Sequence, residues 1–309
     1  MNRRKFTQKL ILASPVVAAC TNIWGQHIEK IDDIPKTDTH VHLFDLDNFS
    51  YSWLNNAPEI NRNFGISDFR EASKEVNIGK IVFMESGADA GFGVKEANWV
   101  AGLAQKEPRI KGIIAKLALD QGRETAQTLD QLAEVDLLRG IRGPFPEGAH
   151  ESSLFLQGLE LLAERNLSFD FLLSTPRLAS AIKVAQKCPQ NVFVLDHLGN
   201  PDIPSGDSER WKKGIKQLAA QPNVNCKLSG IITRIGKDWS REEIEPYILY
   251  VIDQFGMDRL VYGGDWPVVL RAGSYQSWAS VFEEITKQFS KIERQKMYHL
   301  NADRIYRLA

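Results

Sequence analysis

The sequence TDTHVHL, residues 37–43, decides the fold class because it is the first of eight short runs that share one pattern. As a group these runs are rich in Val, Ile, Leu and Phe and almost continuously apolar, as strands covered on both faces are. The runs are Thr37–Leu43, Lys80–Glu85, Ile110–Leu117, Leu137–Arg142, Leu167–Leu173, Val192–His197, Val224–Leu228 and Leu260–Asp265.

Amphipathic stretches separate these runs, and each is long enough for a crossover helix. Examples are Ala97–Gln105, Ser153–Arg165, Pro176–Gln186 and Trp211–Ala220. Strand and helix repeated eight times predict an α/β protein with a single (β/α)8 TIM barrel. A doubly wound open sheet is the alternative. Its dinucleotide-binding form loses its main support, because no Gly-x-Gly-x-x-Gly follows the first run.

Length and charge restrict the classes of function. Residues 34–309 are enough for one barrel, which takes roughly 250 residues, so we expect a single domain there. The 38 basic and 39 acidic residues nearly balance, whereas a nucleic-acid surface needs clustered positive charge. We therefore expect no nucleic acid as a binding partner. The sequence leaves a homo-oligomer open.

The first 25 residues are typical of a signal peptide. Arg3 and Arg4 followed by Phe6 resemble a twin-arginine export signal, and a short apolar stretch, residues 10–19, follows them. The sequence VAAC, ending at Cys20, also resembles a lipobox, in which that cysteine carries a lipid. We expect an exported protein, either periplasmic or a lipoprotein that meets the membrane only through this anchor. The alternative is a cytoplasmic N-terminal helix.

Four side chains at the ends of three predicted strands can carry chemistry. His40 and His42 alternate with Val41, so both point to one face, at the barrel mouth where TIM-barrel enzymes place their active sites. His197 ends the sixth run, and Asp265 ends the eighth after two glycines that let its carboxylate approach a ligand closely. Such imidazoles bind a metal ion or form a hydrogen-bonding patch. The alternative role for Asp265 is an N-cap of the next segment.

Together these segments resemble the amidohydrolase superfamily, and within it the amidohydrolase-related group of TIM-barrel enzymes that includes sugar lactonases of the L-fuconolactonase and L-rhamnonolactonase type. The resemblance extends from about Ile34 to Leu308. Its motifs, in chain order, are DTHVH (38–42), GIR (140–142), DHLGNP (196–201), CKLSG (226–230), GDWPV (264–268) and NADRIY (301–306).

The resemblance implies roles for the residues in these motifs. Asp265 would be the general base that takes a proton from the attacking water, and His197 would help to polarise the carbonyl. His40 and His42, with Asp265, would hold one divalent metal ion, for which zinc is the expected identity; a metal-free site stays open. Arg142 would bind a substrate carboxylate or hydroxyl, with a structural ion pair as the alternative.

The chain departs from the best-known metal-dependent amidohydrolases at two strands. They carry a bridging lysine or carboxylate on the fourth strand and a histidine on the fifth, where this chain has Arg142 and Asp170. A binuclear centre is therefore not expected. The further candidates for binding substrate are Glu85, Trp53, Trp266 and His150. Glu85 is also a candidate metal ligand or second base, with an ion-pair partner as its structural alternative, and packing is the alternative role for the two tryptophans.

The leading hypothesis for function is therefore a hydrolase that opens the lactone of a sugar acid or a similar small polar acid. A metal-dependent decarboxylase of the same superfamily is the first alternative. A noncatalytic exported barrel that binds a ligand in its mouth is the second.

Overall fold

A computed structural model describes residues 34–206 and 208–308 of the protein. Eight parallel strands follow one another around a single sheet in sequence order. The strands are β1 (Lys36–Val41), β2 (Ile78–Met84), β3 (Ile110–Lys116), β4 (Leu138–Arg142), β5 (Ser168–Phe171), β6 (Phe193–Leu195), β7 (Val224–Leu228) and β8 (Leu260–Tyr262). The predicted TIM barrel is confirmed. The predicted signal peptide and Cys20 lie outside the described residues.

The barrel closes between β1 and the segment that follows β8. The amide of Asp265 donates to the carbonyl of His40 at 2.8 Å, and the amide of His42 donates to the carbonyl of Trp266 at 2.7 Å. The Thr39 hydroxyl adds a bond of 2.7 Å to the carbonyl of Tyr262. These bonds place the DTHVH and GDWPV segments side by side.

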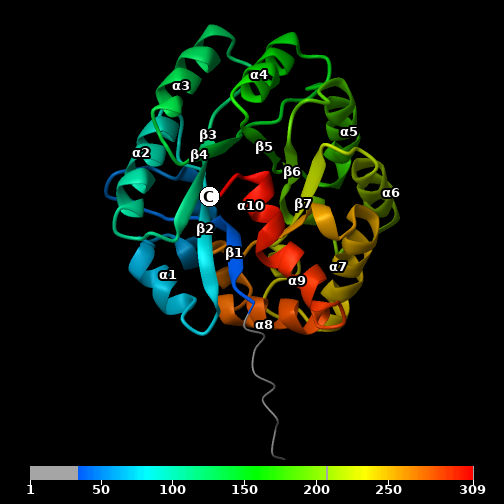
Figure 1. Ribbon diagram of the computed structural model, residues 1–309. Coiled ribbons are helices and arrows are strands. Elements are labelled where there is room, and N and C mark those ends of the chain that lie inside the picture. The colour runs from blue at the N-terminus through cyan, green and yellow to red at the C-terminus, as the bar shows by residue number, and fades with distance from the viewer. Residues whose placement is uncertain (1–33, 207, 309) are drawn as a thin grey trace, which may run out of the picture. The chain divides into compact units, whose positions relative to one another are not determined.

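Helices cover the outside of the barrel, and in Figure 1 they form a ring around the labelled strands. They are α1 (Ile66–Ala72), α2 (Gly93–Ala104), α3 (Arg123–Ala133), α4 (Ser153–Glu164), α5 (Leu178–Lys187), α6 (Ser208–Ala219), α7 (Arg241–Phe255) and α8 (Tyr275–Thr286). Two short helices, α9 (Lys291–Gln295) and α10 (Asn301–Ile305), end the chain, joined by a π-helical turn, Lys296–Leu300. None of the helices described is long and apolar enough to cross a membrane.

Alternation along the strands divides the core into two layers. On β2, Ile81 and Phe83 belong to the layer between the sheet and the helices, whereas Val82 and Met84 belong to a second layer inside the barrel. Both faces of each strand are therefore covered. This is why the strands read as nearly continuous apolar runs rather than as alternating ones.

The end of the chain fills the N-terminal opening of the barrel. Figure 1 shows α10 within the ring of strands, and Tyr306 and Leu308 pack against Val82 and other interior residues. Lys80, near the start of β2, donates to the carboxylate of Asp303 and to the carbonyl of Leu308, each at 2.8 Å. The opposite, C-terminal rim of the barrel is left for the functional site.

Six of the eight strands end one to three residues earlier than expected. His197 and Asp265 were predicted as the last residues of the sixth and eighth strands, but β6 ends at Leu195 and β8 at Tyr262. Both residues have left-handed backbones, with φ of 53° and 56°, which no strand residue adopts. The chain thus leaves the sheet in tight turns at its rim, and these turns carry the two side chains.

Candidate active site

Three imidazoles surround one carboxylate oxygen at the C-terminal rim. The Nε2 atoms of His40 and His42 each lie 3.6 Å from Oδ1 of Asp265, and Nε2 of His197 lies 4.0 Å from the same atom. All four side chains are buried. We call these four residues the His–Asp cluster. The structure thus brings together His40 at the end of β1, His42 just after it, and groups from the turns after β6 and β8.

The turns that carry His197 and Asp265 depend on a neighbouring glycine. A Cβ on Gly230 would lie 2.4 Å from Nδ1 of His197 and 3.0 Å from Oδ2 of Asp265, and φ at Gly230 is 63°. Left-handed backbone at non-glycine residues is uncommon and tends to occur at functional sites. Asp265 caps no helix, since the 3-10 turn after it, Val268–Arg271, has no side-chain cap. Its carboxylate serves the cluster instead.

Gly264 has a different role from the one expected. The sequence predicted that this glycine lets the Asp265 carboxylate approach a ligand. A Cβ there would instead lie 2.3 Å from the ring of Tyr275 and 2.5 Å from Oδ2 of Asp38. Asp38 accepts from the amide of Gly264 at 2.7 Å and from the Tyr275 hydroxyl at 2.7 Å. The missing side chain therefore makes room for a buried aspartate that orients the first strand, and burial raises the pKa of Asp38 to about 6.

Contacts behind the rings orient the imidazoles. Nδ1 of His42 lies 3.0 Å from the carbonyl oxygens of Met84 and Glu85; these oxygens only accept, so Nδ1 carries the proton and Nε2 presents its lone pair. Nδ1 of His197 lies 2.8 Å from the Ser229 hydroxyl. Burial lowers the pKa of His197, and it lowers that of the first-strand His40 well below its usual value. Both rings are therefore neutral near pH 7, the form that binds metal ions.

The cluster fits a single metal ion. Ligand atoms of tetrahedral zinc lie about 3.3–3.5 Å apart when the bonds are about 2.0–2.2 Å. The 3.6 Å separations of His40 and His42 from Asp265 are close to this, and ligand atoms of all three lie within 4.8 Å of one another. Nε2 of His40 also lies 3.4 Å from the Arg142 guanidinium, so an ion would compete with that contact. Imidazole and carboxylate donors favour zinc.

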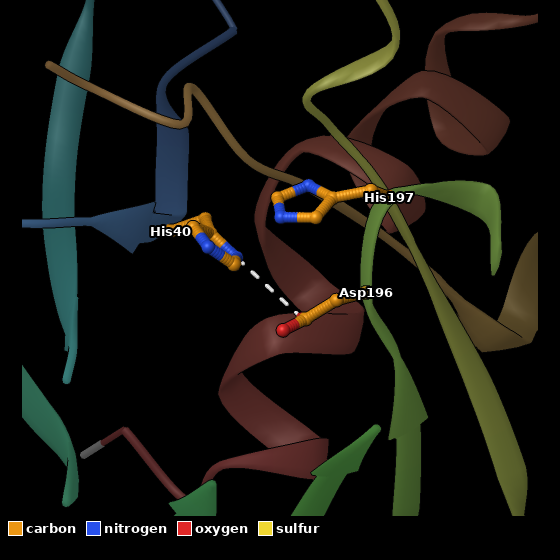
Figure 2. A group of neighbouring side chains, drawn as sticks. All are labelled: His40, Asp196 and His197. Atoms are coloured by element: carbon orange, nitrogen blue, oxygen red, sulfur yellow. Dashed lines mark ion pairs between the residues drawn. The ribbon is translucent and has the colours of Figure 1, made fainter. Parts of the chain in front are cut away.

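A second group of possible ligands, His40, Asp196 and His197, is less suited to an ion. Figure 2 shows His40 approaching from β1, and Asp196 and His197 from the chain after β6, with the His40–Asp196 contact drawn as a dashed line. Asp196 Oδ1 is 2.9 Å from the ammonium of Lys227, and its Oδ2 is 3.2 Å from Arg142. Both oxygens already face cations, so Asp196 serves as the partner of His40 Nδ1, 3.5 Å away.

A buried chain of charges continues below the cluster. Lys227 lies 2.9 Å from both Asp196 and Asp170, and Asp170 accepts from the Tyr306 hydroxyl at 2.7 Å. Burial raises the pKa of Asp170. For Asp196, burial acts in the same direction, but Lys227, His40 and Arg142 outweigh it and hold the pKa well below its usual value. The network connects the C-terminal segment of the chain to the imidazoles.

This network was not predicted from the sequence, although a signal for it exists. Lys227 sits at the interior position of β7, where the strand pattern leads one to expect an apolar residue. A lysine buried on a barrel strand needs carboxylates beside it, and Asp170 and Asp196 occupy the inward positions at the ends of the two preceding strands. Charged residues at inward positions of neighbouring strands would have identified the network.

Arg142 and Glu85 form a buried ion pair beside the cluster. The Arg142 Nε atom donates to the Glu85 carboxylate at 2.6 Å, and one of its terminal nitrogens donates to the Glu85 carbonyl at 2.8 Å. The other Glu85 oxygen accepts from the amide of Gly87 at 2.7 Å. The structural ion pair that was the alternative for Arg142 is thus present. Direct binding of substrate by either residue stays a prediction.

A cavity of about 450 Å³ opens beside this ion pair. Its lining includes Glu85, Lys116, Arg142, Phe145 and Arg177, and we call it the rim cavity. Its volume is in the range of small-molecule sites, about 300–1,000 Å³. A larger cavity of about 770 Å³ lies between α2 and α3. Of these two cavities, the rim cavity alone is lined by residues of the Glu85–Arg142 pair.

The aromatic candidates occupy different environments. Trp266 is 1% exposed, and its ring lies 5.3 Å from that of Phe64 and 5.4 Å from that of Phe69, so it packs in the core and does not present a face to a sugar. Trp53 is partly exposed and donates to the carbonyl of Ser86 at 2.9 Å, next to Glu85. Stacking on Trp53 stays a prediction.

His150 lies apart from the cluster. Its Nδ1 is 3.2 Å from the hydroxyl of Ser180, its Nε2 is 3.3 Å from Lys183, and its carbonyl accepts from Lys187, all on α5. The structure therefore does not bring this predicted substrate-binding residue to the site.

The chain is similar to a known family of proteins and to several of its members. A family model described as amidohydrolase matches residues 37–308. The chain is 30% identical over 300 residues to an uncharacterized protein, y4mH, of Sinorhizobium fredii, which covers 90% of this chain and 100% of that protein. It is 27% identical over 282 residues to an L-fucono-1,5-lactonase of Burkholderia ambifaria, covering 88% and 96% of the two chains. A crystal structure of an amidohydrolase from Burkholderia multivorans with bound zinc has a TM-score of 0.79 and 27% identity, covering 89% and 100%.

Proposed function

Since this chain belongs to the amidohydrolase family, we propose that it hydrolyses the lactone of a sugar acid or of a similar small polar acid. A relative that is 27% identical over nearly its whole length carries the name L-fucono-1,5-lactonase, which supports the proposal. The observation that carries it is the His–Asp cluster, in which three Nε2 atoms lie within 4.0 Å of one oxygen of Asp265. Such a site combines a base for water with imidazoles for the carbonyl oxygen.

Asp265 acts as the general base in the proposed reaction. Its carboxylate takes a proton from a water molecule whose oxygen attacks the lactone carbonyl carbon. With the Ser229 hydroxyl donating to Nδ1, His197 keeps its proton on Nε2 and donates a hydrogen bond to the carbonyl oxygen, where negative charge develops. The ring C–O bond then breaks, and the proton held by Asp265 passes to the leaving oxygen. The product is the open-chain hydroxy acid.

One divalent ion, with zinc favoured by the donors, would be held by His40, His42 and Asp265. Such an ion polarises a carbonyl oxygen and lowers the pKa of a bound water. Zinc in the related amidohydrolase of Burkholderia multivorans supports this assignment. Elemental analysis of protein purified without chelator tests it. We expect close to one equivalent of zinc and loss of activity when it is removed, and full activity of metal-free protein would exclude a required ion.

The test of the base is Asp265→Asn, assayed with a panel of sugar lactones by acid release. We expect turnover to fall by about 100-fold or more, since Asn cannot accept the proton. Asp253→Asn, at an exposed position of α7, is the matched control and should keep full turnover. If Asp265→Asn keeps full turnover, Asp265 is not the general base. Release of carbon dioxide from carboxylated substrates, without acid release from lactones, would replace the hydrolase proposal by a decarboxylase.

A further inference from the structure

The rim cavity has more positive than negative charge in its lining. Three cationic side chains, Lys116, Arg142 and Arg177, face one carboxylate, that of Glu85. Arg142 is already paired with Glu85 at 2.6 Å. Within residues 34–206 and 208–308, Lys116 and Arg177 hydrogen-bond to backbone carbonyls and form no ion pair. Within the cavity lining, Arg177 has no carboxylate partner, and Lys116 interacts only with the more distant carboxylates of Asp89 and Glu96, which lie outside that lining.

The fold directs Lys116 toward the barrel mouth. It is the last residue of β3, and its Cα pairs with that of Arg142 on β4. Ile114, two residues earlier, faces the barrel interior, so the alternation of the strand directs Lys116 to the same side, above it. The side chain is half-buried and its ammonium donates to the carbonyl of Ala88, which uses one of three donors.

Arg177 also lines the cavity and is held in place by Phe145. It ends the 3-10 turn Thr175–Arg177 after β5, and its guanidinium lies 5.3 Å from the ring centroid of Phe145. One terminal nitrogen donates to the carbonyl of Phe145, so the plane of the guanidinium is fixed while its remaining N–H groups stay available. A planar guanidinium held in this way suits a carboxylate, which it can bind through two parallel hydrogen bonds.

The rim cavity and the His–Asp cluster are connected through Arg142. Its Nη1 atom lies 3.4 Å from Nε2 of His40, and Arg142 also lines the cavity. We take a molecule whose ester carbonyl is bound at the cluster to extend past Arg142 toward Lys116 and Arg177. These two residues meet the part of the substrate that does not react.

We propose that Lys116 and Arg177 bind a carboxylate of the substrate, so that the preferred lactone is an anion whose charge lies away from the ester bond. The inference rests on the proposed function and narrows its substrate class from polar lactones to carboxylated ones. A neutral sugar lactone would offer these two half-buried cations no anion inside the cavity. Discrimination between the two lactones then comes from the binding of the remote carboxylate.

The experiment compares the wild-type protein with Lys116→Gln, Arg177→Gln and the double variant, and uses Lys216→Gln, at an exposed position of α6, as the control. The charged substrate is D-glucaro-1,4-lactone and the neutral one is L-fucono-1,5-lactone. Binding of the open dicarboxylate glucarate, against the neutral alditol galactitol, is measured by calorimetry, which needs no turnover. Far-UV circular dichroism verifies that each variant is folded, and Arg177→Lys provides a milder change if Arg177→Gln is not.

We expect the charged lactone to be the better substrate. Its KM should rise by about tenfold or more in each single variant, because each removes a hydrogen bond to a charged group. Glucarate should also bind more weakly to each single variant. The KM for the neutral lactone should not change in these variants, and the control variant should behave like the wild-type protein. Equal binding of glucarate by the wild-type and double-variant proteins would overturn the carboxylate site even if lactones are hydrolysed. If neither lactone reacts but glucarate binding depends on both cations, the hydrolase proposal fails and the carboxylate site stands.

Discussion

Replacing Lys227 by methionine is expected to destabilise the barrel strongly. The Lys227 ammonium is completely buried and lies 2.9 Å from Asp170 and 2.9 Å from Asp196. Methionine fills a similar volume but leaves two carboxylates buried without their cation. Removal of one partner from a buried ion pair costs about 3–5 kcal/mol. This is a large part of the free energy of unfolding of a typical domain, about 5–15 kcal/mol.

Lys212→Met is the matched control for this change. Lys212 lies 2.9 Å from Glu209, the same distance as in the buried pairs, but the two side chains are 39% and 84% exposed. An exposed pair contributes about 0–1 kcal/mol. Burial, rather than distance, is thus the variable that the two substitutions compare.

Urea unfolding followed by far-UV circular dichroism at pH 7 gives both free energies. We expect the midpoint temperature of Lys227→Met to fall by about 6–20 °C in a parallel thermal scan, at about 2–4 °C per kcal/mol. Adding Asp170→Asn should restore part of the loss, because the amide is neutral and its oxygen still accepts from Tyr306. If Lys227→Met loses no more stability than Lys212→Met, the buried charges are not coupled as the geometry indicates.

Two further predictions concern a glycine and a buried acid. Gly230→Ala should lower turnover by about 100-fold while the far-UV circular dichroism spectrum is kept, because the added Cβ would lie 2.4 Å from His197 and displace it; normal turnover would show that the cluster tolerates the shift. Burial raises the pKa of Glu96 to about 8, from an ordinary 4.5, so the folded protein holds this proton more tightly and should lose stability as the pH rises through that window. Glu96→Gln should flatten this decline in urea titrations between the two pKa values, and equal slopes for both proteins would contradict it.

The eight strands and the converging residues could be predicted because each depends on local sequence. A parallel strand covered on both faces produces an apolar run, and the C-terminal ends of such strands meet at one rim. That His40 and His42 point to the same side could be predicted from the alternation of side chains along a strand alone. The left-handed turns at His197 and Asp265 were missed because non-glycine residues rarely adopt them, and the sequence alone indicates only that a turn follows.

The remaining differences arise from contacts between distant segments. Helix α2 begins at Gly93, whereas the amphipathic stretch was predicted from Ala97. The first turn was missed because its Glu96 is buried, although an amphipathic pattern leads one to expect a glutamate to be exposed. Trp266 was a candidate for sugar stacking, but whether a tryptophan faces a cavity or the core depends on partners such as Phe64, about 200 residues away in the chain. Lys116 was not singled out because a lysine at a strand end is ordinary, and only the structure shows that it lines the rim cavity.

Closure of the barrel floor by the segment around Tyr306 has a consequence for how the protein is made. Tyr306 reaches Asp170 across 136 residues of sequence, so the nascent chain cannot complete its buried charge network until that segment has been synthesised. A chain that stopped before residue 301 would have all eight strands and an open, hydrated hole beneath the imidazoles. Quality control in the cell would then meet a barrel without the segment that seals it.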